Sequence, residues 1–120
     1  LLAQMSSRGN LLNNEYTLET ISTGKASPHV LGYIGNGSSA DDVAELRSLV
    51  GDAQMIWTPG INLDNGAGKM GQRYGNPHDS IMSGSDIIIV GSGIHRAENR
   101  SVAAKLYAEA SWDALIQRGQ

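Results

Sequence analysis

Residues 55–60, MIWTPG, are an apolar run that stops at a Pro-Gly pair. A glycine-rich segment follows and ends in the tripeptide QRY at residues 72–74. A second apolar run, DIIIV at residues 86–90, leads into GSG at residues 91–93. In a barrel of parallel strands, the loops after the last two strands commonly bind a phosphate group. The two runs therefore predict the phosphate-binding end of a β/α fold.

The segment between these runs is predicted to be a movable loop with a polar tip. Its glycines favour motion, and its tip carries an amide, a guanidinium and a phenol. A loop that only linked a strand to a helix would rarely need so many residues. We therefore expect the tip, with Gln72 and Tyr74, to hydrogen-bond an anion.

Working outward, the chain divides into four units in which a strand precedes a helix. Apolar runs predict strands at residues 1–5, 30–35, 54–57 and 87–90. Helices are expected at 16–23, from Ser39 to about residue 50, in a short segment opened by Asn76, and at about 101–117. Uniformly apolar strands that alternate with helices favour a parallel sheet with helices outside it, an α/β fold.

Helical spacing also predicts which side chains are buried. In the last helix, four apolar residues fall near one face: Val102, Leu106, Ala110 and Leu115. The two tryptophans, Trp57 and Trp112, are interpreted as packing residues rather than as a stacking platform.

The length of the chain suggests part of a barrel. Its 120 residues are about half of the roughly 250 that a complete (β/α)₈ barrel needs. It begins Leu1-Leu2-Ala3 without an initiator methionine, which suggests a fragment. We expect a single partial domain over residues 1–120, with no second domain.

Composition excludes several classes of partner. The net charge is −3 and Lys and Arg are not clustered, which argues against a nucleic-acid partner. No apolar run approaches the roughly 20 residues of a membrane span, and no secretory leader is expected. The lack of cysteine excludes disulfides and fits a cytoplasmic protein. His29, His78 and His95 lack the spacing of metal ligands, so no metal is expected.

Several segments together resemble orotidine 5′-phosphate decarboxylase, most closely the eukaryotic type and the decarboxylase part of bifunctional UMP synthase. They occur in the family's order and spacing: MSSRG at 5–9, LGYI at 31–34, TPG at 58–60, GQRY at 71–74 and GSDIIIVG at 84–91. Residues 108–114, AEASWDA, are similar to that group's final helix. The combination of segments is specific to the family, whereas any one segment would be weak evidence for the resemblance.

The resemblance implies the second half, strands five to eight, of a (β/α)₈ TIM barrel. It implies decarboxylation of orotidine 5′-monophosphate to UMP, without a cofactor, in a homodimer of whole barrels. The family's catalytic Asp-x-Lys-x-x-Asp signature lies on strand three and is absent from these residues. No catalytic residue is therefore expected in this chain, which would need the missing N-terminal half to be active.

The same resemblance implies roles for individual residues in substrate binding. Ser6 would contact the amide edge of the pyrimidine, and Pro59 would pack beside the nucleotide. Gln72 would bridge the phosphate and the serine on the base side, and the Tyr74 hydroxyl would reach the phosphate. Taken alone, Ser6 could also be a serine that caps its own turn.

The phosphate turn at Gly91 and Ser92 departs from the family. Family members usually have arginine where this chain has Ser92, and that arginine binds the phosphate with a charge-assisted bond. A hydrogen bond to a charged partner is worth roughly 1.5–3 kcal/mol. A hydroxyl and backbone N–H groups remain here, and Arg73 or Arg96 could compensate for the missing charge.

Three other readings of the sequence stay open. One is a non-catalytic phosphate-binding half-barrel, either alone or assembled from two copies, which would have to cover two unpaired strand edges. Another is a different sugar-phosphate enzyme on the same barrel, although residues 70–74 argue against it. A small flavodoxin-like protein is disfavoured because no phosphate loop follows the first strand.

Overall fold

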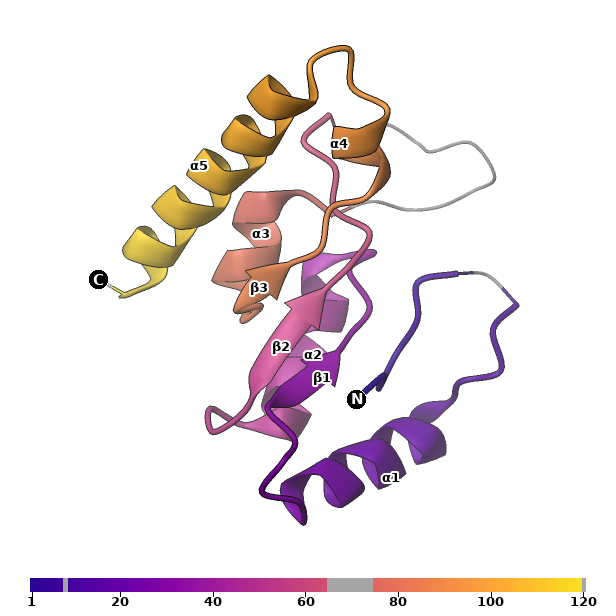
Figure 1. The fold of residues 1–120 in the computed structure, drawn as a ribbon. Helices are drawn as coiled ribbons and strands as arrows, with labels where there is room; N and C mark the ends of the chain where they lie inside the picture. The colour runs from indigo at the N-terminus through magenta and orange to yellow at the C-terminus, as the bar shows by residue number, and fades with distance from the viewer. Residues whose placement is uncertain (8, 65–74, 120) are drawn as a thin grey trace.

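The computed structural model describes residues 1–7, 9–64 and 75–119. Helices and strands alternate along the chain until the last two helices, which follow each other directly (Figure 1). The elements are α1 (Asn14–Lys25), β1 (Gly32–Ile34), α2 (Ala40–Val50), β2 (Met55–Thr58), α3 (Pro77–Met82), β3 (Ile87–Ile88), α4 (Ser92–His95) and α5 (Arg100–Gly119).

The strands form a parallel sheet in the order β1-β2-β3. The N-terminal segment adds a fourth parallel chain beside β1 through a bridge between Leu2 and Ile34, and the Ala3 N–H donates to the Ile34 carbonyl at 2.9 Å. The predicted α/β fold is confirmed. The strand expected at residues 1–5 is reduced to this bridge, and the one expected at 87–90 to residues 87–88.

Side-chain caps decide where three helices begin. Ser39 accepts from the Asp42 N–H and donates to the Asp42 carboxylate, so the helix start predicted at Ser39 is confirmed. Asn76 caps α3, the helix that it was expected to open, and Pro77 takes the first helical position. Helix α1 begins earlier than expected because Asn13 caps it by accepting from the Tyr16 N–H.

The core lies between the strands and helices α1 and α2. It contains Ala3, Ile21, Tyr33, Leu46, Val50 and Ile56, all buried. The Tyr33 hydroxyl donates to the Ile21 carbonyl (2.9 Å) and contacts the side chain of Gln54 (2.8 Å). Burial raises the pKa of Tyr33, and its hydrogen bond to Gln54 opposes that rise. This buried phenol therefore has the polar partners that its burial requires.

The opposite face of the sheet carries one apolar residue from each of the four parallel segments. Leu2, Ile34, Trp57 and Ile87 are successive partners across the sheet. Leu2 is 40% and Trp57 37% exposed, so this face is only partly covered. Side chains alternate between faces along a strand, so Trp57 lies on the face opposite its buried neighbour Ile56. Trp57 packs less than the sequence interpretation expected.

Of the four residues predicted on the buried face of α5, Ala110 and Leu115 are half-buried, whereas Val102 and Leu106 are exposed. Val102 is 53% and Leu106 50% exposed, whereas Tyr107 and Ala114 are buried. The small side chain of Ala114 permits close approach to the rest of the molecule, and α5 makes its main contacts with α3. Trp112, expected to be a packing residue, is 64% exposed. The prediction was wrong for Val102 and Leu106 because the helix carries a second apolar stripe, which includes Tyr107 and Ala114 and is the one that is buried.

A three-residue ionic cluster joins α2, β3 and α5 at the amino end of the sheet. Asp86, directly before β3, accepts from Arg47 of α2 and from Arg118 of α5, the latter at 3.1 Å. Its Oδ2 also accepts from the Ile56 N–H at 2.8 Å. Both guanidinium groups donate further to carbonyl oxygens, Arg47 to Gly84 and Arg118 to Ser85. One carboxylate thus holds two helices against two strands.

Within the described residues, no helix is both long enough and apolar enough to cross a membrane.

Candidate functional site

The candidate site lies at the carboxyl ends of the parallel strands. Ser6 follows the N-terminal segment, Pro59 follows β2, and Gly91 and Ser92 follow β3 after two further residues. Because the segments run parallel, their carboxyl ends emerge along the same edge of the sheet. In folds of this kind, that edge is where ligands bind.

Ser6 is brought next to the corner after β2. A Cβ on Gly60 would stand 3.6 Å from the Ser6 Oγ, which is ordinary van der Waals contact. Gly60 has a φ of +75°, a conformation that favours glycine. Ser6 and Pro59 are both half-buried. The structure therefore places these two predicted residues at one corner, Ser6 against the glycine that follows Pro59.

The end of β1 supports this corner through residues that the sequence analysis did not single out. A Cβ on Gly37 would overlap the Pro59 carbonyl, so the segments after β1 and β2 touch through their backbones. The Asn36 N–H donates to the side chain of Gln4 at 3.2 Å. The close approach of the Pro59 carbonyl explains why residue 37 is glycine.

Backbone pairing joins the residues just after β2 to Gly75, which lies just before α3. Ile61 and Gly75 form a parallel bridge, and the Asn62 N–H donates to the Gly75 carbonyl at 2.8 Å. The Gly75 N–H donates in turn to the carbonyls of Gly37 and Gly60. Gln72, Arg73 and Tyr74 lie outside the described residues, so their predicted roles stay predictions.

The turn after β3 is held by backbone hydrogen bonds. The Gly91 carbonyl accepts from the N–H groups of Ile94 and His95, at 3.1 and 3.0 Å. Ser92, half-buried, is the first residue of the short helix α4, which the sequence analysis missed. Arg96, considered as a replacement for the missing arginine, ends this helix and is exposed. In the described part of the chain, no hydrogen bond joins Gly91 or Ser92 to Ser6 or Pro59.

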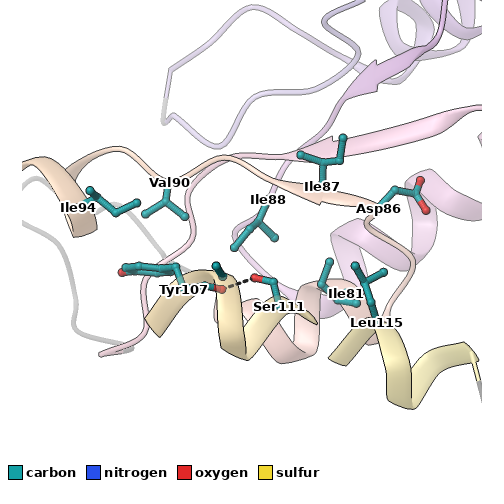
Figure 2. A pocket seen from close by; sticks show the side chains of 10 residues that line it. Ile81, Asp86, Ile87, Ile88, Val90, Ile94, Tyr107, Ser111 and Leu115 are labelled. Atoms are coloured by element: carbon teal, nitrogen blue, oxygen red, sulfur yellow. Dashed lines mark hydrogen bonds between the residues drawn. The ribbon is translucent and has the colours of Figure 1, made fainter. Parts of the chain in front are cut away.

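Tyr107 of α5 reaches this turn and was missed by sequence reasoning. It is 5% exposed and lines a groove of about 340 Å³ between β3 and α5. Figure 2 shows the Tyr107 ring below Val90 and Ile94, the residues on either side of the turn. The groove is lined mainly by apolar side chains and is distinct from the predicted phosphate turn. The only signal in the sequence was a tyrosine in a helix otherwise rich in alanine.

A histidine at the start of α3 contacts the end of α5. His78 Nδ1 lies 3.2 Å from the Asp79 carboxylate, and Nε2 lies 3.1 Å from the Gln117 side-chain oxygen. The hydrogen bonds to Asp79 and Gln117 raise the pKa of His78 above 6.5. The hydrogen bonds of Asp79 with His78 and Asn76 lower the pKa of that carboxyl below 3.8. This pair lies on the surface and belongs to helix packing.

We expect the imidazole of His78 to titrate at a lower pH in an Asp79→Asn variant than in the unchanged chain. The contact favours the protonated ring, so its stabilising effect is fully present below pH 6.5 and is lost as pH rises through the higher folded value. A pH titration of the imidazole ¹H–¹³C signals measures this, and Gln117→Ala should lower the pKa too. Equal His78 pKa values in all three proteins would contradict the assignment.

Metal ligands are not grouped in the described parts of the chain. Across residues 1–7, 9–64 and 75–119, no cluster of three or more His, Asp or Glu side chains could hold a metal ion. The chemical groups that the structure does assemble at the strand ends are hydroxyls, glycine backbone and the ring of Pro59. Such groups can bind a ligand through hydrogen bonds and packing.

Comparisons with known proteins agree on one family. The model of the orotidine 5′-phosphate decarboxylase / HUMPS family matches residues 1–107. The chain is 32% identical over 119 residues to orotidine 5′-phosphate decarboxylase of Passalora fulva, covering 98% of this chain and 43% of that protein. It is 38% identical over 120 residues to uridine 5′-monophosphate synthase of Bos taurus, covering 98% of this chain and 23% of that protein.

A solved structure shows the same fold. Orotidine 5′-phosphate decarboxylase from Pyrococcus horikoshii OT3 matches with a TM-score of 0.69 and 26% identity, over 92% of this chain and 49% of that one. The partial TIM barrel that the sequence predicted is therefore confirmed. The chain spans less than half the length of these relatives. With the family model matched over residues 1–107, the chain belongs to the orotidine 5′-phosphate decarboxylase / HUMPS family.

Proposed function

We propose that this chain supplies the phosphate- and base-binding half of an orotidine 5′-phosphate decarboxylase. The complete enzyme would convert orotidine 5′-monophosphate to UMP and CO₂ in pyrimidine biosynthesis. The observation that carries the proposal is the family match over residues 1–107, which spans the strand ends with Ser6, Pro59, Gly91 and Ser92. Their shared edge of the sheet supports it.

The proposed roles divide between the two ends of a nucleotide. Ser6 would hydrogen-bond the amide edge of the pyrimidine, since a hydroxyl both donates and accepts. Pro59 would pack against the nucleotide beside it. Gly91 and Ser92 would bind the phosphate through backbone N–H groups and the serine hydroxyl. Gln72 and Tyr74 would add further contacts to the phosphate, as the resemblance implies.

The proposed chemistry needs residues from outside these 120. In the family, the carbanion that develops at C6 of the pyrimidine is protonated by a lysine flanked by aspartates, and this sequence contains no Asp-x-Lys-x-x-Asp run. Binding of the phosphate, far from C6, would contribute by orienting the reacting end and excluding water from it. Such remote binding energy lowers the barrier only where it acts on the transition state. By itself the chain would bind without turnover.

Further parts of the proposal concern the whole enzyme. It would act without metal, flavin or pyridoxal, as a homodimer of complete barrels, in the cytoplasm. The family resemblance supports the first two parts, and the lack of cysteine is compatible with the third.

A second candidate function is a phosphate-binding half-barrel without catalysis. It is favoured by the absence of the catalytic signature from the sequence. It also requires something to cover the apolar row formed by Leu2, Ile34, Trp57 and Ile87, two of which are more than a third exposed. The mass of the intact polypeptide separates the two proposals. A mass near 12.7 kDa favours the half-barrel, and about twice that favours a complete decarboxylase.

Binding of UMP and of uridine tests the phosphate-binding role directly. We expect UMP to bind about tenfold more tightly than uridine, since only UMP carries the group that the turn would hold, and each tenfold step is about 1.4 kcal/mol. Isothermal calorimetry or NMR titration of the 120-residue chain measures both affinities. The amides of residues 91–93 should shift with UMP but not with uridine. Equal affinities would contradict the phosphate site.

A further inference from the structure

Tyr107 connects two chain segments that follow neighbouring strands. Its hydroxyl accepts a hydrogen bond from the Leu63 N–H at 3.1 Å and lies 3.3 Å from the Asn62 Oδ1, to which it donates. Both residues come shortly after β2. The Tyr107 side chain is 5% exposed, so these partners replace water for a phenol that has almost no access to it.

The same hydroxyl also touches the turn after β3. A Cβ on Gly93 would overlap the Tyr107 hydroxyl and ring, so the phenol rests directly on the backbone of the turn. Figure 2 shows the ring lying along Val90 and Ile94, which flank that turn. Gly93 is therefore needed because of Tyr107, and the turn and the phenol fit each other closely.

The segment that Tyr107 holds is itself tightly connected. The Asn62 side-chain oxygen also accepts from the Asp64 N–H at 3.0 Å, and the Asn62 N–H donates to the Gly75 carbonyl at 2.8 Å. Gly75 in turn bonds to the carbonyl of Gly60, beside Ser6. A continuous set of contacts thus runs from the turn after β3, through Tyr107, to the corner after β2.

We infer that Tyr107 is a positioning residue that sets the separation between the turn at residues 91–93 and the segment after β2. The inference rests on the proposed function, in which that turn binds a phosphate group. Tyr107 would not touch the ligand, because its hydroxyl is already bonded to Asn62 and Leu63. Its effect on binding would come from holding the backbone of the turn in place before the ligand arrives.

Replacing Tyr107 with phenylalanine tests this role, because it removes the hydroxyl and keeps the ring. We expect the affinity for inorganic phosphate to fall about threefold to tenfold, which corresponds to the net worth of about one hydrogen bond. NMR titration with inorganic phosphate, followed at the amides of residues 91–93, measures it. Amide hydrogen exchange at Leu63 should become faster in the variant, since its N–H loses its acceptor.

Tyr16→Phe is the matched control, because Tyr16 is 42% exposed on α1. It should change neither the phosphate affinity nor exchange at Leu63. If Tyr107→Phe loses its native spectrum, Asn62→Ala removes the other side-chain member of the contact, and the same weaker binding of phosphate is expected.

The outcomes separate this inference from the proposed function. Unchanged phosphate affinity in Tyr107→Phe, with faster exchange at Leu63, would make Tyr107 a purely structural residue and overturn the inference. If the unchanged chain shows no phosphate-dependent shifts, the phosphate site itself fails. In that case, faster exchange at Leu63 together with a displaced Gly93 signal still supports Tyr107 as the link between the segments, and the absence of both overturns it.

Discussion

Replacing Ser92 with arginine is expected to raise the affinity of the chain for inorganic phosphate about tenfold to a hundredfold. The family that the chain resembles usually has arginine at this position, whereas this chain has serine. A guanidinium adds a fixed charge and two parallel donors, and a charge-assisted bond is worth roughly 1.5–3 kcal/mol. Ser92 is half-buried at the start of α4, so an arginine at this position would extend from the backbone of the proposed phosphate site.

The titration of Ser92→Arg needs two comparisons to identify the cause of tighter binding. Ser22→Arg adds the same charge on the exposed face of α1 and should leave phosphate affinity nearly unchanged. Ser92→Lys adds charge without the planar fork and should give a smaller gain than arginine. Equal gains in Ser22→Arg and Ser92→Arg would reduce the effect to net charge and remove the support for a phosphate site at this turn.

A further variant tests whether Arg96 supplies the positive charge that Ser92 lacks. If Arg96 already supplies the missing charge, Arg96→Ala should weaken phosphate binding in the unchanged chain and much less in Ser92→Arg. Arg96 is exposed at the end of α4. No loss of affinity in Arg96→Ala excludes this residue as the compensating charge and leaves the hydroxyl and backbone to bind the anion.

Replacing Asp86 with alanine is expected to destabilise the fold by about 3 kcal/mol. The substitution leaves the guanidinium groups of Arg47 and Arg118 without their carboxylate and the Ile56 N–H without its acceptor. These side chains are 18–30% exposed, so the loss should lie at the lower end of the range for buried ion pairs. Urea unfolding at pH 7, followed by far-UV circular dichroism, measures the difference.

Asp113→Ala is the matched control for Asp86→Ala, since Asp113 is exposed on α5. It should change the free energy of unfolding by less than about 0.5 kcal/mol. The triple variant Arg47→Met, Asp86→Leu, Arg118→Met should recover part of the loss, because an apolar set of similar size leaves no unpaired charge. A loss below about 1 kcal/mol in Asp86→Ala would show that the cluster is solvated like an ordinary surface pair.

Local chemistry explains why many elements were predictable. The capping serine and asparagine, Ser39 and Asn76, act on N–H groups three residues away, so sequence alone locates these helix starts. The positions of the strands follow from short, uniformly apolar runs that alternate with helical segments. The site prediction likewise rested on short segments. Ser6 follows the parallel N-terminal segment and Pro59 directly follows β2, and the two meet at one corner.

Helix α5 shows where such reasoning stops. Two apolar stripes are compatible with its sequence, and the buried one is selected by Tyr107 at one end and by the Arg118–Asp86 pair at the other. Both anchors are long-range contacts, made to residues 44 and 32 positions away in the sequence. The spacing of apolar residues within the helix cannot predict these contacts, so Val102 and Leu106 were assigned to the buried side although they are exposed.

The sequence by itself determined the alternation of strands and helices, the family and the segments that end in the candidate site, since each depends on neighbouring residues or on short motifs. Only the tertiary structure decided that Tyr107 supports the turn at Gly93, that Asp86 joins two helices, and that one face of the sheet is left partly exposed. These features arise when distant segments compete for the same space and the same hydrogen-bond partners. Such competition is settled only once the chain has folded.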